Sequence, residues 1–213
     1  MGTRGLTCVY KDEEYKVAQY GQWDHYPSGQ GVTILSFLRG ELINEGENDK
    51  PYKVKNVIYD KKAFTNAIDN CYYASDEEIG KAWDEAGAEG KDSITFEVSA
   101  KMQHIHPQYA RDMGAMVLPY IQKTGGIGLK NNINFSGDSL FCEWSYVIDY
   151  DKNVLEVYKG FVKEPHEGRF AKYFCKKDYR DENQYYPVAL LKSWDLDNLP
   201  TSDEFIAGLT LID

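Results

Sequence analysis

Two short runs in which apolar and polar residues alternate open the chain. Residues 4–10 and 14–20 are rich in β-branched and aromatic side chains, and the polar residues 11–13 separate them. Alternation with a period of two predicts strands, and a short polar connection between two strands predicts a hairpin. A turn-rich loop follows over residues 21–31, and the apolar run at residues 32–38 predicts a short helix.

Apolar residues spaced three or four apart predict helices in the middle of the chain. The first apolar stripe consists of Phe64, Ala67, Ile68, Cys71 and Tyr72. A second stripe, over residues 79–86, follows Ser75 and Glu78, whose spacing is that of a capping box. Gly87 stands where it can end this helix. The pattern therefore predicts two helices within residues 61–90.

A further helical pattern covers residues 106–123, where Pro119 is expected to kink or end the helix near residue 118. Alternating apolar positions predict strands on both sides of this pattern. The strand-like segments are residues 93–98, 140–148, 154–161 and 186–192. A short helix or a coil is expected after Pro200, with Ser202 or Thr201 as the cap.

Strands, then helices, then strands are typical of an α+β fold. We therefore expect a single α+β domain over residues 1–213, with a mainly antiparallel sheet that begins with the N-terminal hairpin. Helices from residues 61–90 and 106–122 are expected to cover the sheet. The polar stretch from Gly40 to Lys50 has no periodicity, and we expect it to be the most mobile internal segment.

Composition narrows the possible functions. The 213 residues include 24 Lys and Arg against 34 Asp and Glu, and the net charge of −10 disfavours binding to a nucleic-acid backbone. There is no apolar run long enough for a membrane span, and residues 1–20 lack the apolar segment of a signal peptide. We expect a cytoplasmic protein that does not bind membranes. Its four cysteines are then expected to be unpaired thiols: Cys8, Cys71, Cys142 and Cys175.

Three motifs that could carry chemistry have simpler interpretations. Residues 125–128 are glycine-rich but lack the spacing of a phosphate-binding loop. His104 and His106 lack a third metal ligand, and a helix entry is the simpler prediction. Asp149 and Asp151 lack the later residues of a calcium loop, so a hairpin turn is predicted there. No metal site and no cofactor are expected.

The loop after the hairpin carries the candidate binding site, which consists of Arg4, Trp23, Asp24, His25 and Tyr26. Loops that follow a sheet hairpin are where binding groups usually lie. Arg4 falls in an apolar strand and needs an acceptor there, and hairpin geometry brings Asp24 close to it. We expect an ion pair between Arg4 and Asp24, structural or functional, with Trp23, His25 and Tyr26 around it. No catalytic residue is assigned.

Three segments resemble a family of uncharacterised phage, bacterial and fungal proteins. These segments are MGTRG at residues 1–5, WDHYPSGQG at residues 23–31 and EWSYVIDYD at residues 143–151. The family shares this opening, the aromatic–acid–aromatic–proline loop and the later strand in the same order. The resemblance implies no established activity, and it indicates a phage or other mobile gene.

The start of the chain also resembles, more weakly, the choloylglycine hydrolase and penicillin V acylase group of N-terminal nucleophile hydrolases. Thr3 and Arg4 match the family's opening, and Asp24 matches an acid of a later motif. Gly2 stands where the family has its nucleophilic cysteine, and glycine has no side chain that could attack an amide. The resemblance implies an αββα layering of the fold and counts against the family's acyl-transfer chemistry.

Two functional hypotheses follow from these observations. The first is a non-catalytic cytoplasmic protein, encoded by a phage or prophage and of the counter-defence type. Its acidic, tyrosine-rich surface would bind a host protein or sequester a small-molecule ligand. The alternative is an amide hydrolase of the N-terminal nucleophile type, with a site around Thr3, Arg4 and Asp24. An acidic mimic of nucleic acid fits less well, because the 34 acidic residues are interspersed with 24 basic ones.

Overall fold

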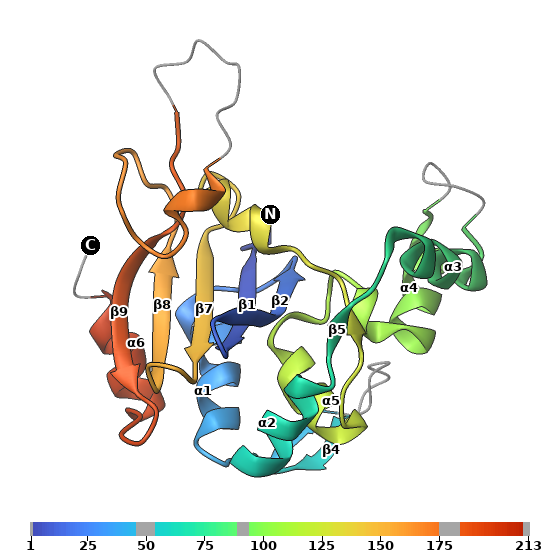
Figure 1. Cartoon of the computed structure of the whole chain (residues 1–213), viewed down its shortest axis with the longest axis horizontal. Helices are drawn as coiled ribbons and strands as arrows, with labels where there is room; N and C mark the ends of the chain where they lie inside the picture. The colour runs from blue at the N-terminus through green and yellow to red at the C-terminus, as the bar shows by residue number, and fades with distance from the viewer. Residues whose placement is uncertain (1, 46–53, 89–93, 175–183, 211–213) are drawn as a thin grey trace.

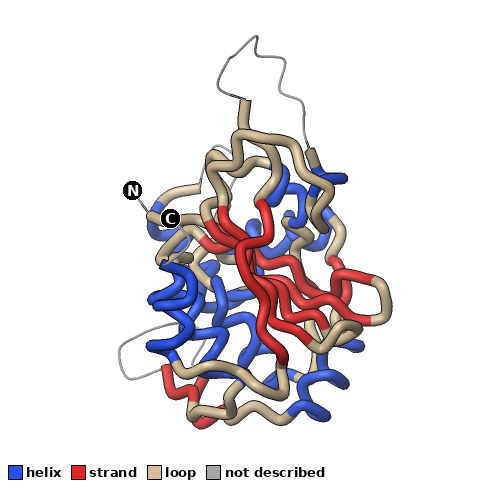
Figure 2. Tube along the Cα trace, turned by 90° about the vertical axis from the view of Figure 1, so that its left-hand side faces the viewer, coloured by secondary structure: helices blue, strands red, loops and turns tan. Residues whose placement is uncertain are grey.

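A five-stranded sheet forms the centre of the structure (Figure 1). The computed structural model describes residues 2–45, 54–88, 94–174 and 184–210. The strands of the sheet are β1 (Gly5–Lys11), β2 (Glu14–Gly21), β7 (Trp144–Asp149), β8 (Val154–Lys159) and β9 (Ala189–Asp195). Their order is β2-β1-β7-β8-β9, and each neighbouring pair is antiparallel except the parallel pair β1–β7. Figure 2 shows these strands as one twisted sheet.

One face of the sheet is covered by helices. These are α1 (Val32–Leu38), α2 (Lys61–Asp69), α5 (Val117–Thr124) and α6 (Ser202–Thr210). Phe37, Phe64 and Phe205 from these helices are fully buried in the same core as Val9 of β1. Irregular segments cover the other face, where Phe170 packs in a second core. The predicted α+β fold with a mainly antiparallel sheet is confirmed.

Two further helices, α3 (Asp76–Ala86) and α4 (Phe96–Ile105), pack against each other and stand beside this body (Figure 1). Met102 is fully buried between them. The short strands β5 (Tyr72–Tyr73) and β6 (Gly128–Leu129) pair in parallel next to this helical pair. Strands β3 (Ile43–Glu45) and β4 (Val54–Val57) form an antiparallel pair elsewhere.

The αββα layering implied by the hydrolase resemblance is not the arrangement of the described residues. That layering needs two stacked sheets between two helical layers. Here the described strands form one five-stranded sheet and two separate two-stranded pairs. Helices cover one face of the large sheet, and loop segments fill the other, so no second sheet packs on it.

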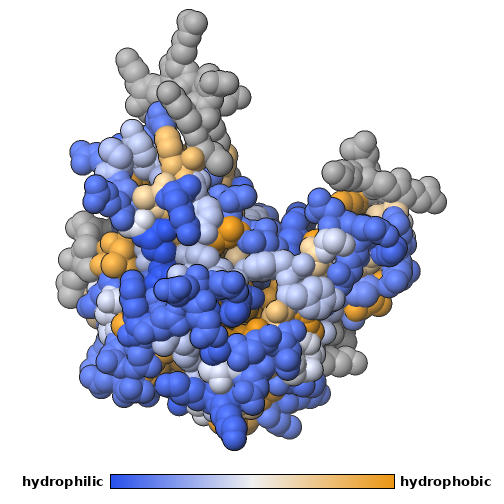
Figure 3. Space-filling model, in the orientation of Figure 1, coloured by the Kyte–Doolittle hydropathy of each residue, from blue (hydrophilic) through white to orange (hydrophobic). Residues whose placement is uncertain are grey.

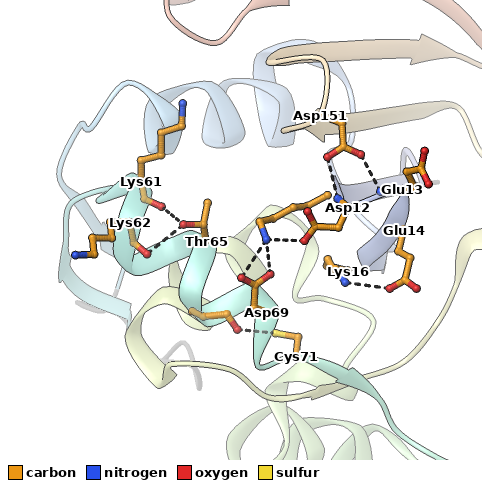
Figure 4. A network of polar contacts seen from close by, with 12 residues as sticks. Asp12, Glu13, Glu14, Lys16, Lys61, Lys62, Thr65, Asp69, Cys71 and Asp151 are labelled. Atoms are coloured by element: carbon orange, nitrogen blue, oxygen red, sulfur yellow. Dashed lines mark hydrogen bonds and ion pairs between the residues drawn. The ribbon is translucent and has the colours of Figure 1, made fainter.

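The predicted N-terminal hairpin is confirmed. Strands β1 and β2 pair around Asp12 and Glu13, which both have positive φ angles of 55° and 62°. Asp151 holds this turn, because its carboxylate accepts hydrogen bonds from both backbone amides at 2.8 Å (Figure 4). Lys11 extends the contact to Asp69 of α2 at 2.8 Å. Asp151 thus lies in a hairpin turn, as predicted, and its two oxygens bind a neighbouring turn.

Local capping signals predicted the ends of two helices correctly. Ser75 Oγ accepts from the Glu78 amide at 3.1 Å at the start of α3, and Gly87 ends that helix in the left-handed conformation. Thr201 Oγ1 accepts from the Glu204 amide at 3.3 Å, and the Thr201 amide donates to the Glu204 carboxylate at 2.8 Å. This reciprocal pair begins α6.

The strand predicted over residues 93–98 is wrong for the described part of that range. Thr95 Oγ1 accepts from the Val98 amide at 3.2 Å and caps α4, which begins at Phe96. Ile94 and Phe96, whose alternation suggested a strand, are both exposed. Six residues of alternation fit the start of a helix as well, and the capping hydrogen bond favours the helix.

The helix predicted over residues 106–123 is interrupted. Helix α4 ends at Ile105, a 3₁₀ turn begins at Pro107, and α5 begins only at Val117. Pro119 lies in the first turn of α5, where backbone amides have no intrahelical partner. It therefore neither kinks nor ends the helix.

Other boundaries shift by a few residues. Tyr72, at the end of the first apolar stripe, lies in β5 and not in α2. The strand predicted over residues 140–148 begins only at Trp144, the first residue of β7. The segment Gly40–Lys50 contains β3, and its residues 46–50 lie outside the described residues, together with the prediction of mobility there.

The described cysteines are free thiols, as predicted. Cys8, Cys71 and Cys142 form no disulfide, and Cys175 lies outside the described residues. Burial raises the pKa of Cys8 well above its usual value, and it raises the pKa of Cys142 to about 12. Both thiols are therefore neutral members of the second core.

A buried cluster of charges holds the covering loop to the second face of the sheet. Arg169 Nε donates to Glu156 at 2.7 Å, and Arg169 Nη2 donates to Asp149. The Asp149, Glu156 and Arg169 side chains are 0%, 6% and 12% exposed. Tyr158 donates to Glu156 at 2.7 Å, and the guanidinium lies 4.5 Å from the centre of the Tyr10 ring. Burial acts to lower the pKa of Arg169, but its hydrogen bonds and charge interactions with the carboxylates raise that pKa above its usual value.

Candidate functional site

His25, one of the predicted site residues, is a buried anchor of the N-terminal loop. Its ring lies over Gly5 and Gly21, which face each other across the β1–β2 hairpin. A Cβ at Gly21 would overlap the imidazole. The backbone completes the anchor, because the His25 amide donates to Thr3 O at 3.1 Å and Tyr146 OH donates to His25 O at 2.7 Å. His25 therefore fixes the loop to one end of the sheet.

The imidazole of His25 is neutral. Burial lowers its pKa to about 4, although a hydrogen bond with Trp23 O acts in the opposite direction. Nδ1 donates this hydrogen bond, at 3.3 Å, because a carbonyl oxygen can only accept. Nε2 then carries the lone pair, and it is buried without a partner among the described residues.

We expect His25 to make stability depend on pH. Between pH 6.5, its ordinary pKa, and pH 4, its pKa in the folded protein, the unfolded chain binds a proton that the native protein does not. Stability should therefore fall as pH falls through this window and level off below it, by about 3 kcal/mol in total. Urea unfolding of the wild type and His25→Gln from pH 4 to 7 measures the difference. The exposed His104→Gln serves as the control, and identical pH profiles for wild type and His25→Gln would contradict the prediction.

The predicted ion pair between Arg4 and Asp24 is wrong: within the described ranges these two residues do not pair. The Arg4 guanidinium lies 4.6 Å from the centre of the Phe141 ring, and the Arg4 amide donates to Glu143 at 3.3 Å. Asp24 is exposed, with a φ of 58°, and its carbonyl accepts from the Gln30 amide at 2.7 Å. Arg4 precedes β1 and is only partly buried, so its charge does not need a carboxylate partner.

The remaining predicted residues, Trp23 and Tyr26, are exposed. Trp23 Nε1 donates to Asp112 at 2.7 Å, and Asp112 also accepts from Gln103 of α4. The predicted site residues therefore do not converge on one pocket. Trp23 instead ties the N-terminal loop to Asp112, which lies in the wall of a cleft.

This cleft lies between the end of β2 and the helical pair α3–α4, with a volume of about 270 Å³. Figure 3 shows that the surface is hollowed between the body of the domain and this pair of helices. Segments far apart in the sequence build its walls. They include Gln19 and Tyr20 of β2, Trp83 of α3, Ser99 of α4, and Arg111 and Lys130 from loops.

Gln19, a residue of the cleft wall, has a side-chain oxygen without a hydrogen-bond partner among the described residues. Its side chain is 3% exposed, Nε2 donates to Tyr20 O at 3.1 Å, and Oε1 is buried without a partner among the described residues. Thr7 pairs with Gln19 in the hairpin, and the His25 ring lies over the Gly5–Gly21 pair. Both residues also carry a buried polar atom without a partner among the described residues. An unpaired buried acceptor costs about 1–3 kcal/mol. Oε1 of Gln19 has almost no accessible surface, so it is enclosed by the protein and is not open to a ligand in the cleft.

Positive charge predominates in the cleft. Arg111 and Lys130 are exposed, and neither forms an ion pair within the residues that the structure describes. The carboxylate of Asp112 accepts from Trp23 on one oxygen and from Gln103 on the other. The cleft therefore has two cations against one carboxylate, in a protein whose net charge is −10.

A second hollow, of about 330 Å³, adjoins the first, because Trp83, Ile94 and Lys130 line both. The second hollow continues along α3, where Asp76, Ile79, Gly80 and Asp84 line it, so two carboxylates accompany the one lysine there. Small-molecule sites in proteins commonly measure about 300–1,000 Å³. The two hollows together are therefore of the size that a small organic ligand needs.

The sequence contained one signal of this cleft. Gln19 occupies a position of β2 that faces the helix-covered core, two residues after the buried Val17. A polar residue at such a position breaks the expected alternation. Lys130 and Arg111 carry no comparable signal, because their proximity to β2 depends on the path of two distant loops.

The structural findings on metal ions and membrane spans cover the described residues alone. Within them, no group of three or more His, Cys, Asp or Glu side chains is arranged to hold a metal ion. His104 lies in the last turn of α4, whereas His106 stands at the entry to the 3₁₀ turn that begins at Pro107. His106 Nε2 lies 2.7 Å from Glu85. None of the described helices is long and apolar enough to span a membrane.

Comparisons with known proteins found no match for this chain among family models, curated proteins or solved structures. The resemblance of the opening segments to uncharacterised phage, bacterial and fungal proteins stays a prediction.

Proposed function

We propose that this protein is a non-catalytic binding protein that sequesters a small molecule in the cleft beside α3 and α4. The observation that carries the proposal is the pair of adjoining hollows, of about 270 Å³ and about 330 Å³, which share Trp83, Ile94 and Lys130 in their walls. In the first hollow, Arg111 and Lys130 outnumber the one carboxylate, Asp112, and they favour a negatively charged group on the ligand there. Asp76 and Asp84 disfavour such a group in the second hollow.

Hydrolysis has less support from the same geometry. The groups of the alternative hydrolase site do not converge, because Arg4 lies on Phe141 and Asp24 is exposed. Phage origin and a counter-defence role rest on the sequence resemblance and remain predictions.

Thermal-shift measurements with a panel of small carboxylates, phosphates and nucleotides test this proposal. A ligand at a hundred times its Kd stabilises the native state by about 2.7 kcal/mol, which raises the Tm of a domain of this size by about 5–10 °C. Ser99→Trp, which fills the cleft, should abolish the shift. Ser193→Trp, at an exposed position of β9, should retain it. A panel without any stabilising compound, or a shift that persists in Ser99→Trp, would contradict the proposal.

A further inference from the structure

We infer that the ligand of the two hollows is an amino-carboxylate in which an apolar segment separates an ammonium group from a carboxylate, an inference that rests on the proposed function. The two hollows differ in the sign of their charge, and an apolar wall joins them. Two residues of α3 that weaken a helix line the second hollow. These observations select the two charged groups of the ligand and the segment between them.

The charges of the hollows favour a ligand with two charged groups of opposite sign. Arg111 and Lys130 accompany one carboxylate, that of Asp112, in the first hollow. Asp76 and Asp84 accompany Lys130 in the second. An anion that extended into the second hollow would meet two carboxylates, and a cation in the first would meet Arg111. A ligand that directs its carboxylate to the first hollow and its ammonium group to the second avoids both repulsions.

The two carboxylates of the second hollow are available to a ligand. The other acidic residues of α3 have side-chain partners, which are Lys81 for Glu77 at 2.8 Å, Tyr72 for Glu78 at 2.6 Å and His106 for Glu85 at 2.7 Å. Asp76 and Asp84 have neither an ion pair nor a side-chain hydrogen bond within the residues that the structure describes. The acidic side chains of α3 that lack a partner are therefore those that line the hollow.

Asp84 is the carboxylate that pairs with the ammonium group. Asp76 lies in the first turn of α3, where the helix dipole favours a negative charge, so helix stability explains its place. Asp84 lies in the last turn, where the dipole disfavours a negative charge and where α3 has no basic residue. An ammonium group beside Asp84 would offset this unfavourable interaction.

Gly80 leaves room for the ligand in the second hollow. It lies in the interior of α3, where glycine is less favourable than alanine. A Cβ at this position would point into open space, so close packing against another segment does not require a glycine. Gly80 and Asp84 are one turn apart and lie on the same face of α3. Residues that break local rules are expected at functional sites, and these two break them on the face that lines the hollow.

The wall between the charged ends is apolar. Trp83 and Ile94 line both hollows, and the Ile94 side chain is 46% exposed. Covering this surface is favourable when the covering group is itself apolar. The ligand segment that joins the two charged groups is therefore apolar. An α-amino acid does not fit, because it carries both charges on one carbon and would place them in a single hollow.

Isothermal titration calorimetry on the full chain tests the inference with two zwitterions, ω-aminooctanoate and trileucine with free ends. Octanoate and octylamine each lack one charge of the first zwitterion. The N-acetylated and C-amidated peptides each lack one charge of the second. We expect at least one zwitterion to bind ten times or more tightly than both of its singly charged analogues. The zwitterion that binds more tightly shows whether the ligand is an ω-amino acid or a peptide.

Asp84→Asn should remove the advantage of the zwitterion over the analogue without an ammonium group. The affinity of that analogue should stay unchanged, which separates lost recognition from lost folding. Glu77→Gln is the matched control, because it removes a carboxylate of the same helix that pairs with Lys81 and lies outside both hollows. Glu77→Gln should retain the full preference for the zwitterion.

Arg111→Gln tests the carboxylate end in the same way. This variant should weaken the zwitterion about tenfold, the loss expected for one charge-assisted hydrogen bond, and should leave the analogue without a carboxylate unchanged. Lys101→Gln, at an exposed position of α4 outside both hollows, should change neither affinity.

Gly80→Leu tests the occupancy of the second hollow. The Tm of this variant should equal or exceed that of the wild type, because leucine is more favourable than glycine inside a helix. Its affinity for the zwitterion should nevertheless fall tenfold or more, because the new side chain fills the hollow.

Three results overturn the inference. They are equal binding of each zwitterion and its analogues, a preference that survives Asp84→Asn, and undiminished binding to Gly80→Leu. If other compounds still stabilise the protein in a manner that Ser99→Trp abolishes, the proposed function stands and only the ligand class is wrong.

Discussion

Arg169→Met is expected to lower the free energy of unfolding by about 3–5 kcal/mol, which corresponds to a fall in Tm of about 6–20 °C. The substitution leaves Asp149 and Glu156, which are 0% and 6% exposed, without the cation that they share. Removing one partner of a buried ion pair costs far more than the pair contributes, because the remaining charges stay out of water. Urea unfolding at pH 7, followed by circular dichroism, measures the change.

A triple variant, Arg169→Met with Asp149→Asn and Glu156→Gln, is the matched control. It removes all three charges at once and keeps side-chain oxygens where Lys152 N–H and Tyr158 OH donate. Replacing a whole buried ionic cluster by neutral groups is often close to neutral for stability. The triple variant should therefore be more stable than Arg169→Met alone. A single variant within about 1 kcal/mol of the wild type would show that the cluster is not effectively desolvated.

Gly5→Ala is expected to destabilise the protein by more than about 3 kcal/mol, the upper end for overpacking. Its Cβ would overlap the backbone carbonyl of Trp144 on β7 as well as the His25 ring. The carbonyl belongs to the neighbouring strand of the sheet and cannot turn away. Gly21→Ala is expected to cost about 1–3 kcal/mol, because its Cβ would meet the His25 ring alone among its nearest neighbours.

A double-variant cycle with His25→Ala distinguishes the two glycines. Once the ring is gone, Gly21→Ala should add little further cost, while Gly5→Ala should remain destabilising because the overlap with Trp144 persists. Chemical unfolding of the five variants supplies the comparison. Equal rescue at both positions would mean that the β1–β7 spacing adjusts and that His25 alone explains both glycines.

Features set by neighbouring residues were predictable. The β1–β2 hairpin, helix α1 and the capped ends of α3 and α6 each depend on a few consecutive residues, such as Ser75 with Glu78. The strand predicted at residues 93–98 was wrong because six residues of alternation are ambiguous, and a single cap at Thr95 decides between helix and strand.

The candidate site was predicted only in part. Trp23 lies near the cleft through its hydrogen bond to Asp112, but His25 is buried and Arg4 binds Phe141 rather than Asp24. The expected pair with Asp24 required Arg4 to lie inside an apolar strand, where its charge would need an acceptor. Its position just before β1 leaves it partly exposed, so the face of an aromatic ring is a sufficient partner.

The α+β class, the N-terminal hairpin and the capped ends of α3 and α6 could be predicted from the sequence, because periodicity, turns and caps are encoded within about ten residues. The parallel pairing of β1 with β7, the burial of His25 over two glycines, and the cleft between β2 and α3–α4 depend on tertiary contacts. These features join Gln19, Trp83 and Lys130, which no local pattern connects. Their proximity follows from which apolar faces are buried together, a choice made by the whole chain at once.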